Sequence, residues 1–123
     1  MKVFLVDDSA IVRERLVTML SEVQGVEIAG EAENLHDAIK GFEKLKPDVV
    51  ILDIRMPGGN GIDVLENIKE KRPATKVIML TNYPYPQYRK KCMDSGADFF
   101  FDKSTEFRKV VEVLNHLIIE SSE

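Results

Sequence analysis

The sequence predicts an α/β fold in which a parallel β-sheet is covered by helices on both faces. Five short, largely apolar runs predict buried strands, at residues 3–6, 26–29, 49–52, 77–80 and 97–101. Segments with apolar residues at helical spacing lie between and after these runs. Strands and helices that alternate with short connections require right-handed crossovers, which place helices on both faces of one parallel sheet.

The predicted helices follow the five strands in order. The clearest apolar stripes lie at 12–23, 35–45 and 107–118, and a shorter stripe at 62–68 marks a helix that ends before Pro73. A weaker helix covers about 87–94 and is closed by Gly96. The candidate N-caps are Asp8 or Ser9, Asn34, and Ser104 or Thr105.

Length and composition indicate one domain and exclude several classes of protein. The chain has 123 residues and a net charge of −4. We expect a single domain at 1–119 with a loose tail at 120–123. The acidic balance argues against direct nucleic-acid binding. No apolar run exceeds four residues, so neither a membrane span nor a signal peptide is expected, and the predicted location is cytoplasmic.

The single cysteine, Cys92, excludes an internal disulfide, and no Cys/His group has the spacing of a zinc site. We interpret Cys92 as a core-edge residue, and His36 and His116 as surface residues. Gly58, Gly59 and Gly61 belong to no phosphate-binding motif and are interpreted as a turn.

Polar residues follow four of the predicted strands. They are Asp7 and Asp8, Asp53, Thr81 and Asn82, and Asp102 and Lys103. Ligands of an open parallel sheet bind beyond the carboxyl ends of its strands. Each residue taken alone is explained by a cap, a turn or a solvated charge.

Caps, turns and solvated charges do not explain why polar residues follow so many of the strands at once. If the first and third strands are neighbours, Asp7, Asp8 and Asp53 crowd together, which costs free energy without a counter-charge. Lys103 supplies one positive charge. A divalent cation would balance the rest, and carboxylate oxygens suit Mg²⁺.

Four segments in this order are similar to a known family. They are the acidic pair after the first strand, "VVILDIRMPGGNG" around Asp53, "VIMLTN" at the end of the fourth strand, and "GADFFFDKS" with Lys103. Together they resemble the receiver domain of two-component response regulators over essentially the whole chain. The resemblance implies a doubly wound (βα)5, flavodoxin-like three-layer sandwich with five parallel strands in the order 2-1-3-4-5. It also implies a signalling module and not an enzyme.

The resemblance implies roles for the acidic residues. Asp53 is the implied phosphoryl acceptor from a histidine kinase. Asp7, Asp8, Asp53 and the backbone carbonyl of Arg55 are the implied ligands of Mg²⁺.

It also implies how the phosphoryl group is bound and sensed. Lys103 and the Thr81 hydroxyl are expected to bind the phosphoryl oxygens, which with Asp53 completes the catalytic set. Thr81 and Phe100 are expected to form the switch pair, since the new charge draws in a hydroxyl and vacates space for a ring.

The implied partners are a sensor histidine kinase or phosphotransfer protein and an output domain or protein, with a homodimer after phosphorylation. The output face is expected on the helix near 87–94, the strand 97–101 and the helix 107–118. Beside it, three tyrosines and three cations form either a partner site or a solvated face. They are Tyr83, Tyr85, Tyr88, Arg89, Lys90 and Lys91.

The sequence departs from the common family pattern at three positions. Ser104 replaces the usual proline, Asn82 replaces a small residue, and Phe100 replaces a tyrosine. Each is expected to affect the geometry or rate of switching. A second function also fits the aspartate chemistry, namely a small Mg²⁺-dependent phosphohydrolase with an aspartyl-phosphate intermediate.

Overall fold

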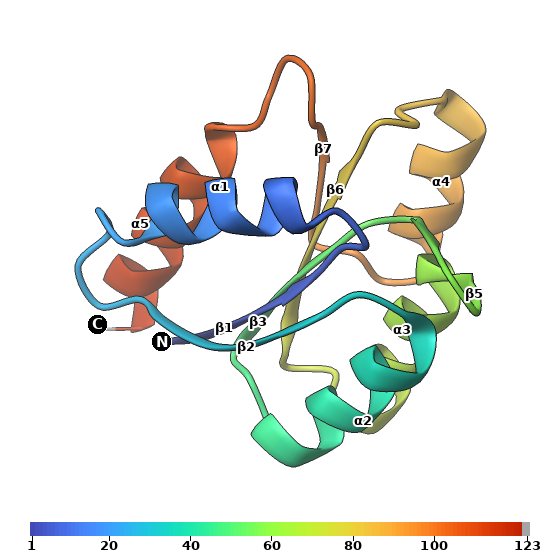
Figure 1. Ribbon diagram of the computed structural model, residues 1–123, viewed down its shortest axis with the longest axis horizontal. Coiled ribbons are helices and arrows are strands. Elements are labelled where there is room, and N and C mark those ends of the chain that lie inside the picture. The colour runs from blue at the N-terminus through green and yellow to red at the C-terminus, as the bar shows by residue number, and fades with distance from the viewer. Residues whose placement is uncertain (122–123) are drawn as a thin grey trace.

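The structure is a computed structural model that describes residues 1–121. Its central element is a five-stranded parallel sheet with strand order β2-β1-β3-β6-β7 (Figure 1). This confirms the predicted order, because β6 and β7 are the fourth and fifth strands of the main sheet. The strands are β1 (Lys2–Val6), β2 (Glu27–Ala32), β3 (Val49–Leu52), β6 (Lys76–Thr81) and β7 (Phe99–Asp102).

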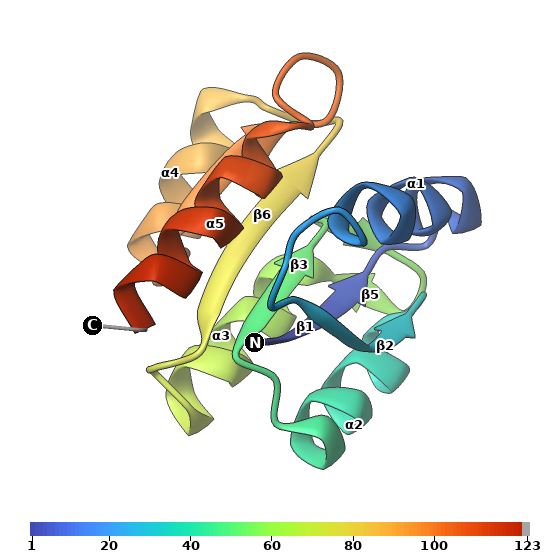
Figure 2. The ribbon, with the colours of Figure 1, turned by 90° about the vertical axis from the view of Figure 1, so that its left-hand side faces the viewer.

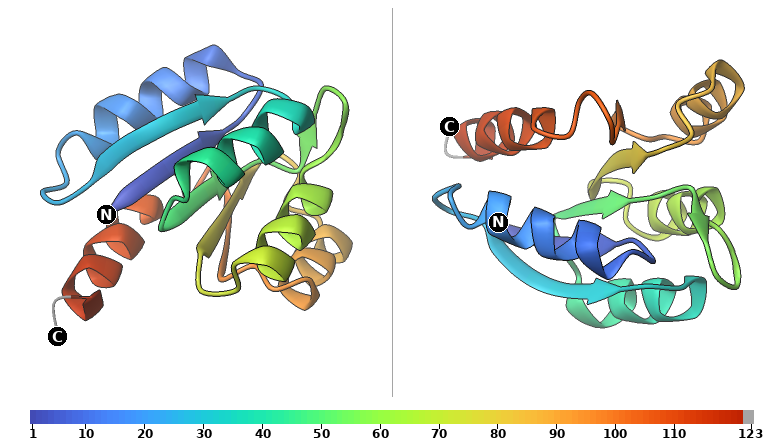
Figure 3. Two further views of the ribbon diagram at one scale, coloured as in Figure 1. Left: turned by 90° about the horizontal axis from the view of Figure 1, so that it is seen from below. Right: turned by 45° about the horizontal axis from the view of Figure 1, so that its top comes forward.

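Helices cover both faces of the sheet, as predicted. One face carries α1 (Ala10–Leu20) and α5 (Lys109–Ser121), as Figures 2 and 3 show. The other carries α2 (Leu35–Leu45), α3 (Gly61–Lys71) and α4 (Pro86–Asp94). Successive strand residues point to opposite faces, so Phe4 packs into one core cluster and Leu5 into the other.

The predicted strands at the two edges of the sheet needed correction. The run at 26–29 predicted a fully buried strand, yet β2 extends to Ala32, and most of its residues are exposed or half-buried. The strand predicted at 97–101 begins at Phe99, and only Phe100 of β7 is buried. An edge strand lacks one neighbour, so polar residues such as Glu31 are tolerated there.

The observed helix caps decide between the predicted alternatives. Ser9, and not Asp8, caps α1, because its Oγ accepts a 3.2 Å hydrogen bond from the Val12 amide. Asn34 caps α2 as predicted. The cap predicted at 104–105 was wrong, since α5 begins at Lys109. Residues 102–106 instead form a turn, closed by a 2.8 Å hydrogen bond from the Glu106 amide to the Asp102 carbonyl.

A short antiparallel hairpin follows β3 and was not predicted. It pairs β4 (Arg55–Met56) with β5 (Gly59–Asn60), and Pro57 and Gly58 form its turn. Gly58 has φ of 89°, which agrees with the predicted turn role. At the start of α3, a Cβ on Gly61 would overlap the carbonyl oxygen of Asp53. Glycine at this position therefore lets the hairpin fold back beside Asp53.

The C-terminal helix extends further than expected. α5 includes residues 120 and 121, which the sequence had indicated as part of a tail. The rest of that predicted tail, residues 122–123, lies outside the described residues. Within residues 1–121, no helix combines the length and hydropathy needed to cross a membrane.

Candidate functional site

The predicted site residues lie together at the carboxyl ends of the parallel strands. β1 and β3 are in register, with Val6 opposite Leu52, so Asp7 and Asp53 follow at the same level. The Asp53 amide donates to the Val6 carbonyl at 3.1 Å, and the Lys103 amide donates to the Thr81 carbonyl at 2.9 Å. The pairing thus continues one residue beyond the strands and fixes the backbone beneath the site.

Three carboxylates and one ammonium group converge there. Oxygen atoms of Asp7, Asp8 and Asp53 all lie within 4.8 Å of one another. Lys103 Nζ lies 2.6 Å from Asp7 Oδ2 and 2.7 Å from Asp53 Oδ2. Asp7, Asp53 and Lys103 are buried, whereas Asp8 is exposed. The close approach expected from the sequence is confirmed, and one cation faces three acids.

Burial and pairing shift the pKa values of two members of this cluster. Burial raises the pKa of Asp7 above its ordinary value, although the hydrogen bond from Lys103 opposes the shift. Burial alone would lower the pKa of Lys103, but its hydrogen bonds to Asp53 and Asp7 outweigh that effect and raise it. Lys103 therefore stays protonated at neutral pH.

The other carboxylate oxygens of the cluster differ in whether they accept hydrogen bonds. Asp53 Oδ1 accepts a 2.7 Å hydrogen bond from the Ile54 amide, and Asp7 Oδ1 accepts one of 2.9 Å from the Ser9 amide. Among residues 1–121, no hydrogen bond or ion pair holds the Asp8 carboxylate. An all-oxygen donor set with excess negative charge and one unengaged carboxylate fits Mg²⁺.

Arg55, whose backbone carbonyl was predicted as a further ligand, begins β4 two residues after Asp53. Its guanidinium carbon lies 4.3 Å from the ring centroid of Tyr83. Hydrogen bonding to Tyr88 raises the pKa of Arg55. The hairpin after Asp53 is thereby joined to the β6–α4 loop and to α4, a link that the sequence motifs did not indicate.

The two predicted switch residues lie on neighbouring strands. Thr81 ends β6 and is fully buried, and its Oγ1 accepts a 3.0 Å hydrogen bond from the Tyr83 amide. Phe100 lies in β7 opposite Met79 and is buried in the core cluster under α3 and α4. Arg89 of α4 covers it, with the guanidinium carbon 5.0 Å from the ring centroid. Asn82, next to Thr81, is exposed.

The predicted tyrosine cluster is present. The ring centroid of Tyr85 lies 6.5 Å from that of Tyr83 and 5.8 Å from that of Tyr88. Tyr85 is half exposed. The three rings therefore form one cluster that extends from the β6–α4 loop to the first turn of α4.

The other candidate residues occupy structural positions. His36 and His116 are exposed, as predicted. Cys92 is fully buried, and this burial raises its pKa to about 11. Such a thiol is a poor nucleophile, in agreement with the sequence interpretation.

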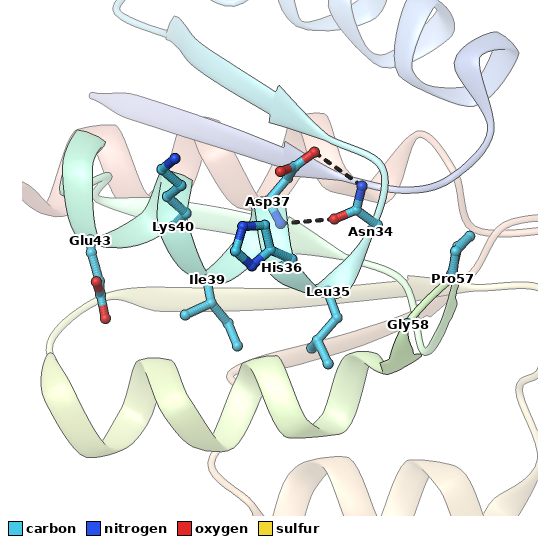
Figure 4. A pocket seen from close by; sticks show the side chains of 9 residues that line it. All are labelled: Asn34, Leu35, His36, Asp37, Ile39, Lys40, Glu43, Pro57 and Gly58. Carbon is cyan, nitrogen blue, oxygen red and sulfur yellow. Dashed lines mark hydrogen bonds between the residues drawn. The ribbon is translucent and has the colours of Figure 1, made fainter.

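An open groove of about 790 Å³ lies along α2 (Figure 4). Leu35 and Ile39 of α2 point into it, and Pro57 and Gly58 border it at the hairpin turn. None of its lining residues belongs to the carboxylate cluster. The groove therefore gives no support to the phosphohydrolase alternative.

Comparison with known proteins agrees with this geometry. Residues 3–115 match the family model described as the response regulator receiver domain. The chain belongs to this family. The receiver domain is a phosphorylation-activated signalling module of two-component systems.

Relatives of this receiver domain differ in length. The chemotaxis protein CheY of Thermotoga maritima is 36% identical over 114 residues, which cover 93% of this chain and 94% of CheY. The response regulator protein VraR of Staphylococcus saprophyticus is 33% identical over 113 residues, which cover 92% of this chain. The matched part is 54% of VraR, so the receiver domain spans about half the length of such relatives.

A solved structure supports the same assignment of the fold. The response regulator domain of Thermotoga maritima CheB superposes with a TM-score of 0.84 at 32% identity. The match covers 98% of this receiver domain and 94% of the CheB domain. The flavodoxin-like architecture predicted from the sequence is thereby confirmed.

Proposed function

We propose that this receiver domain accepts a phosphoryl group on Asp53 from a phosphohistidine of a sensor histidine kinase or phosphotransfer protein. The observation that carries the proposal is the buried Asp53 carboxylate, whose Oδ2 lies 2.7 Å from Lys103 Nζ within a cluster of three acids. Among these carboxylates it is the one at the end of the central strand β3. Phosphorylation at this point adds charge where the sheet, the hairpin and α3 meet.

The proposed reaction is a direct transfer. A carboxylate oxygen of Asp53 forms a bond to phosphorus while the bond between phosphorus and the histidine nitrogen breaks, and the electron pair stays on that nitrogen. Negative charge is spread over the phosphoryl oxygens during the transfer. The receiver domain therefore needs to position the phosphoryl group and to neutralise its charge. Lys103 and the Thr81 hydroxyl are the donors that we assign to these oxygens.

Asp7, Asp8 and Asp53 are proposed to hold Mg²⁺, with the Arg55 carbonyl as a further oxygen. When bound, the cation supplies positive charge that neutralises the acids and the phosphoryl oxygens. The support is the donor set, since three carboxylates face one ammonium group and only oxygens are offered. The exposed Asp8 carboxylate gives solvent access to the cluster.

We further propose that Thr81 and Phe100 transmit phosphorylation to the face formed by α4, β7 and α5, where an output domain or partner binds. Support comes from contacts on both residues. Thr81 is tied to the β6–α4 loop through Tyr83, and Phe100 is covered by Arg89, whose Nη2 donates to the Phe100 carbonyl at 3.3 Å.

The proposal is tested by incubation with a small phosphoryl donor and Mg²⁺, followed by intact-mass measurement. We expect one added phosphoryl group on the wild type, none on Asp53→Asn, and none when Mg²⁺ is chelated. Asp102→Asn is the matched control. Asp102 ends β7 at the same edge of the sheet, but it lies outside the carboxylate cluster. An unchanged wild-type mass, or equal labelling of Asp53→Asn, contradicts the proposal.

A further inference from the structure

Arg13 of α1 reaches the peptide that joins Asp7 to Asp8. Its Nη1 donates a 2.6 Å hydrogen bond to the backbone carbonyl of Asp7. On the other side, Nε lies 3.0 Å from Glu31 Oε1 of β2, and Nη2 lies 3.9 Å from Glu33 Oε2. The side chain is only 14% exposed. The guanidinium group is therefore held between the backbone of Asp7 and the acidic residues Glu31 and Glu33. The edge strand β2, which carries Glu31, runs beside α1 (Figure 3).

The other polar atoms of Asp7 are already engaged. Its amide donates to the Ala32 carbonyl at 3.0 Å, Oδ1 accepts from the Ser9 amide, and Oδ2 meets Lys103. The carbonyl is the remaining polar group, and Arg13 binds it. All four polar atoms of Asp7 are thus fixed, and the plane of the Asp7–Asp8 peptide is fixed with them.

Asp8 depends on that peptide for its direction. Its carboxylate is exposed, and no hydrogen bond or ion pair in residues 1–121 holds it. Yet its oxygen lies within 4.8 Å of oxygens of Asp7 and Asp53. The backbone must therefore aim the Asp8 side chain at the cluster.

We propose that Arg13 is a positioning residue for the cation site, which holds the Asp7–Asp8 peptide so that Asp8 points at Asp53. The inference rests on the proposed function, because it assumes that the three carboxylates bind Mg²⁺. Arg13 acts through another residue and does not contact the cation.

The role is one of geometry and not of charge. Glu31 and Glu33 face the guanidinium group and offset its positive charge. A planar guanidinium presents several N–H groups in fixed directions, so it binds the Asp7 carbonyl and Glu31 together. A lysine keeps the charge but has a single nitrogen at the end of a flexible chain, and it cannot reproduce both contacts.

The test measures Mg²⁺ binding by calorimetric titration of wild type, Arg13→Lys and Arg13→Met. The free energy of unfolding without Mg²⁺ is measured separately with urea. Loss of a group that orients a ligand costs about 10 to 100-fold in metal affinity. We therefore expect both variants to bind Mg²⁺ at least about 10-fold more weakly. Arg15→Lys is the matched control, since Arg15 lies on the same helix but stacks on Phe107, and its Mg²⁺ affinity should equal that of the wild type.

The outcomes separate the inference from the proposed function. If the wild type does not bind Mg²⁺, the proposed cation site fails and the role of Arg13 fails with it. If the wild type binds Mg²⁺ and folded Arg13→Lys binds it equally well, only the role of Arg13 is overturned. A lower unfolding free energy with unchanged Mg²⁺ affinity also overturns it, because that result describes a merely structural side chain. Arg13→Lys keeps the charge and most of the length, so the test does not depend on whether Arg13→Met folds.

Discussion

The backbone amide of Tyr83 donates a hydrogen bond of 3.0 Å to the hydroxyl oxygen of Thr81. Because the oxygen is the acceptor, the hydroxyl proton stays available to a second acceptor such as a phosphoryl oxygen. Tyr83 in turn stacks with Arg55, two residues after Asp53. A movement of Thr81 would therefore also displace the β6–α4 loop, which contacts the hairpin that follows Asp53.

From this relationship we predict that Thr81→Ala separates phosphorylation from switching. The substitution leaves the proposed acceptor Asp53 and the ammonium group of Lys103 in place, so phosphorylation of Asp53 should still occur. Without the hydroxyl, the amide signals of β7 and α4 should no longer shift when beryllofluoride and Mg²⁺ are added as a phosphoryl mimic. Nuclear magnetic resonance measures this, and Thr81→Ser, which keeps the hydroxyl, should retain the shifts. Shifts in Thr81→Ala equal to those of the wild type would refute the switch role.

A second prediction concerns Mg²⁺ and thermal stability. An ion that binds only the native state stabilises it by RT ln(1 + [L]/Kd), so Mg²⁺ should raise the melting temperature with concentration. Asp8→Ala should abolish most of this rise while leaving the fold intact, because Asp8 is exposed and makes no other side-chain bond in residues 1–121. Differential scanning calorimetry with and without Mg²⁺ checks both results. Asp63→Ala serves as the control, because Asp63 is an exposed acid in the first turn of α3. If Mg²⁺ still raised the melting temperature of Asp8→Ala as in the wild type, the cation would bind elsewhere.

A third prediction is that the Cys92 thiol is unreactive in the native protein. The side chain is fully buried, and burial raises its pKa from 9.0 to about 11. At pH 8 a reagent in solution therefore cannot reach the sulfur, and the thiol is protonated. Labelling by a disulfide reagent should be slower than in urea by a factor on the order of 10³ or more, because it requires opening of the structure. An introduced cysteine at exposed Ser104 gives the fast reference. Fast labelling of native Cys92 would mean that α4 opens readily from the sheet.

The parts of the fold that were predictable are those with a strong local signal. The central strands are continuous apolar runs such as 49–52 because both of their faces are buried. The edge strand β2 includes Gly30 and Glu31, which interrupt the apolar run. The predicted strand therefore ended at residue 29, whereas β2 extends to Ala32. The hairpin at 55–60 escaped prediction because each of its strands has two residues, too few for an alternating pattern.

The same distinction holds at the candidate site. Asp7, Asp8, Asp53, Thr81 and Lys103 were found because each follows a strand that the pattern reveals. Arg13 was missed, since its contact with the Asp7 carbonyl depends on where the helix packs and not on a motif. Likewise, the start of α5 at Lys109 was misjudged, because the turn after Lys103 is held by contacts of Asp102 and Glu106.

The final prediction is a pH-dependent gain of stability in Asp7→Asn. The pKa of Asp7 is raised on folding by burial, against the opposing hydrogen bond from Lys103, and Asp53 adds repulsion. Between the ordinary pKa of 3.8 and the raised native pKa, the folded state binds more protons than the unfolded state. The free energy of unfolding of the wild type therefore falls as pH rises through this window, and above it a constant cost remains.

Asparagine cannot ionise, so Asp7→Asn should escape that cost. We expect the variant to match the wild type below the ordinary pKa, to gain on it as pH rises, and to hold a constant advantage at neutral pH. Urea unfolding without Mg²⁺ at several pH values measures the difference, with Glu66→Gln on the exposed side of α3 as the matched control. If Asp7→Asn were instead less stable than the wild type at neutral pH, the attraction between Asp7 and Lys103 would outweigh burial, and the sign of the Asp7 shift would be reversed.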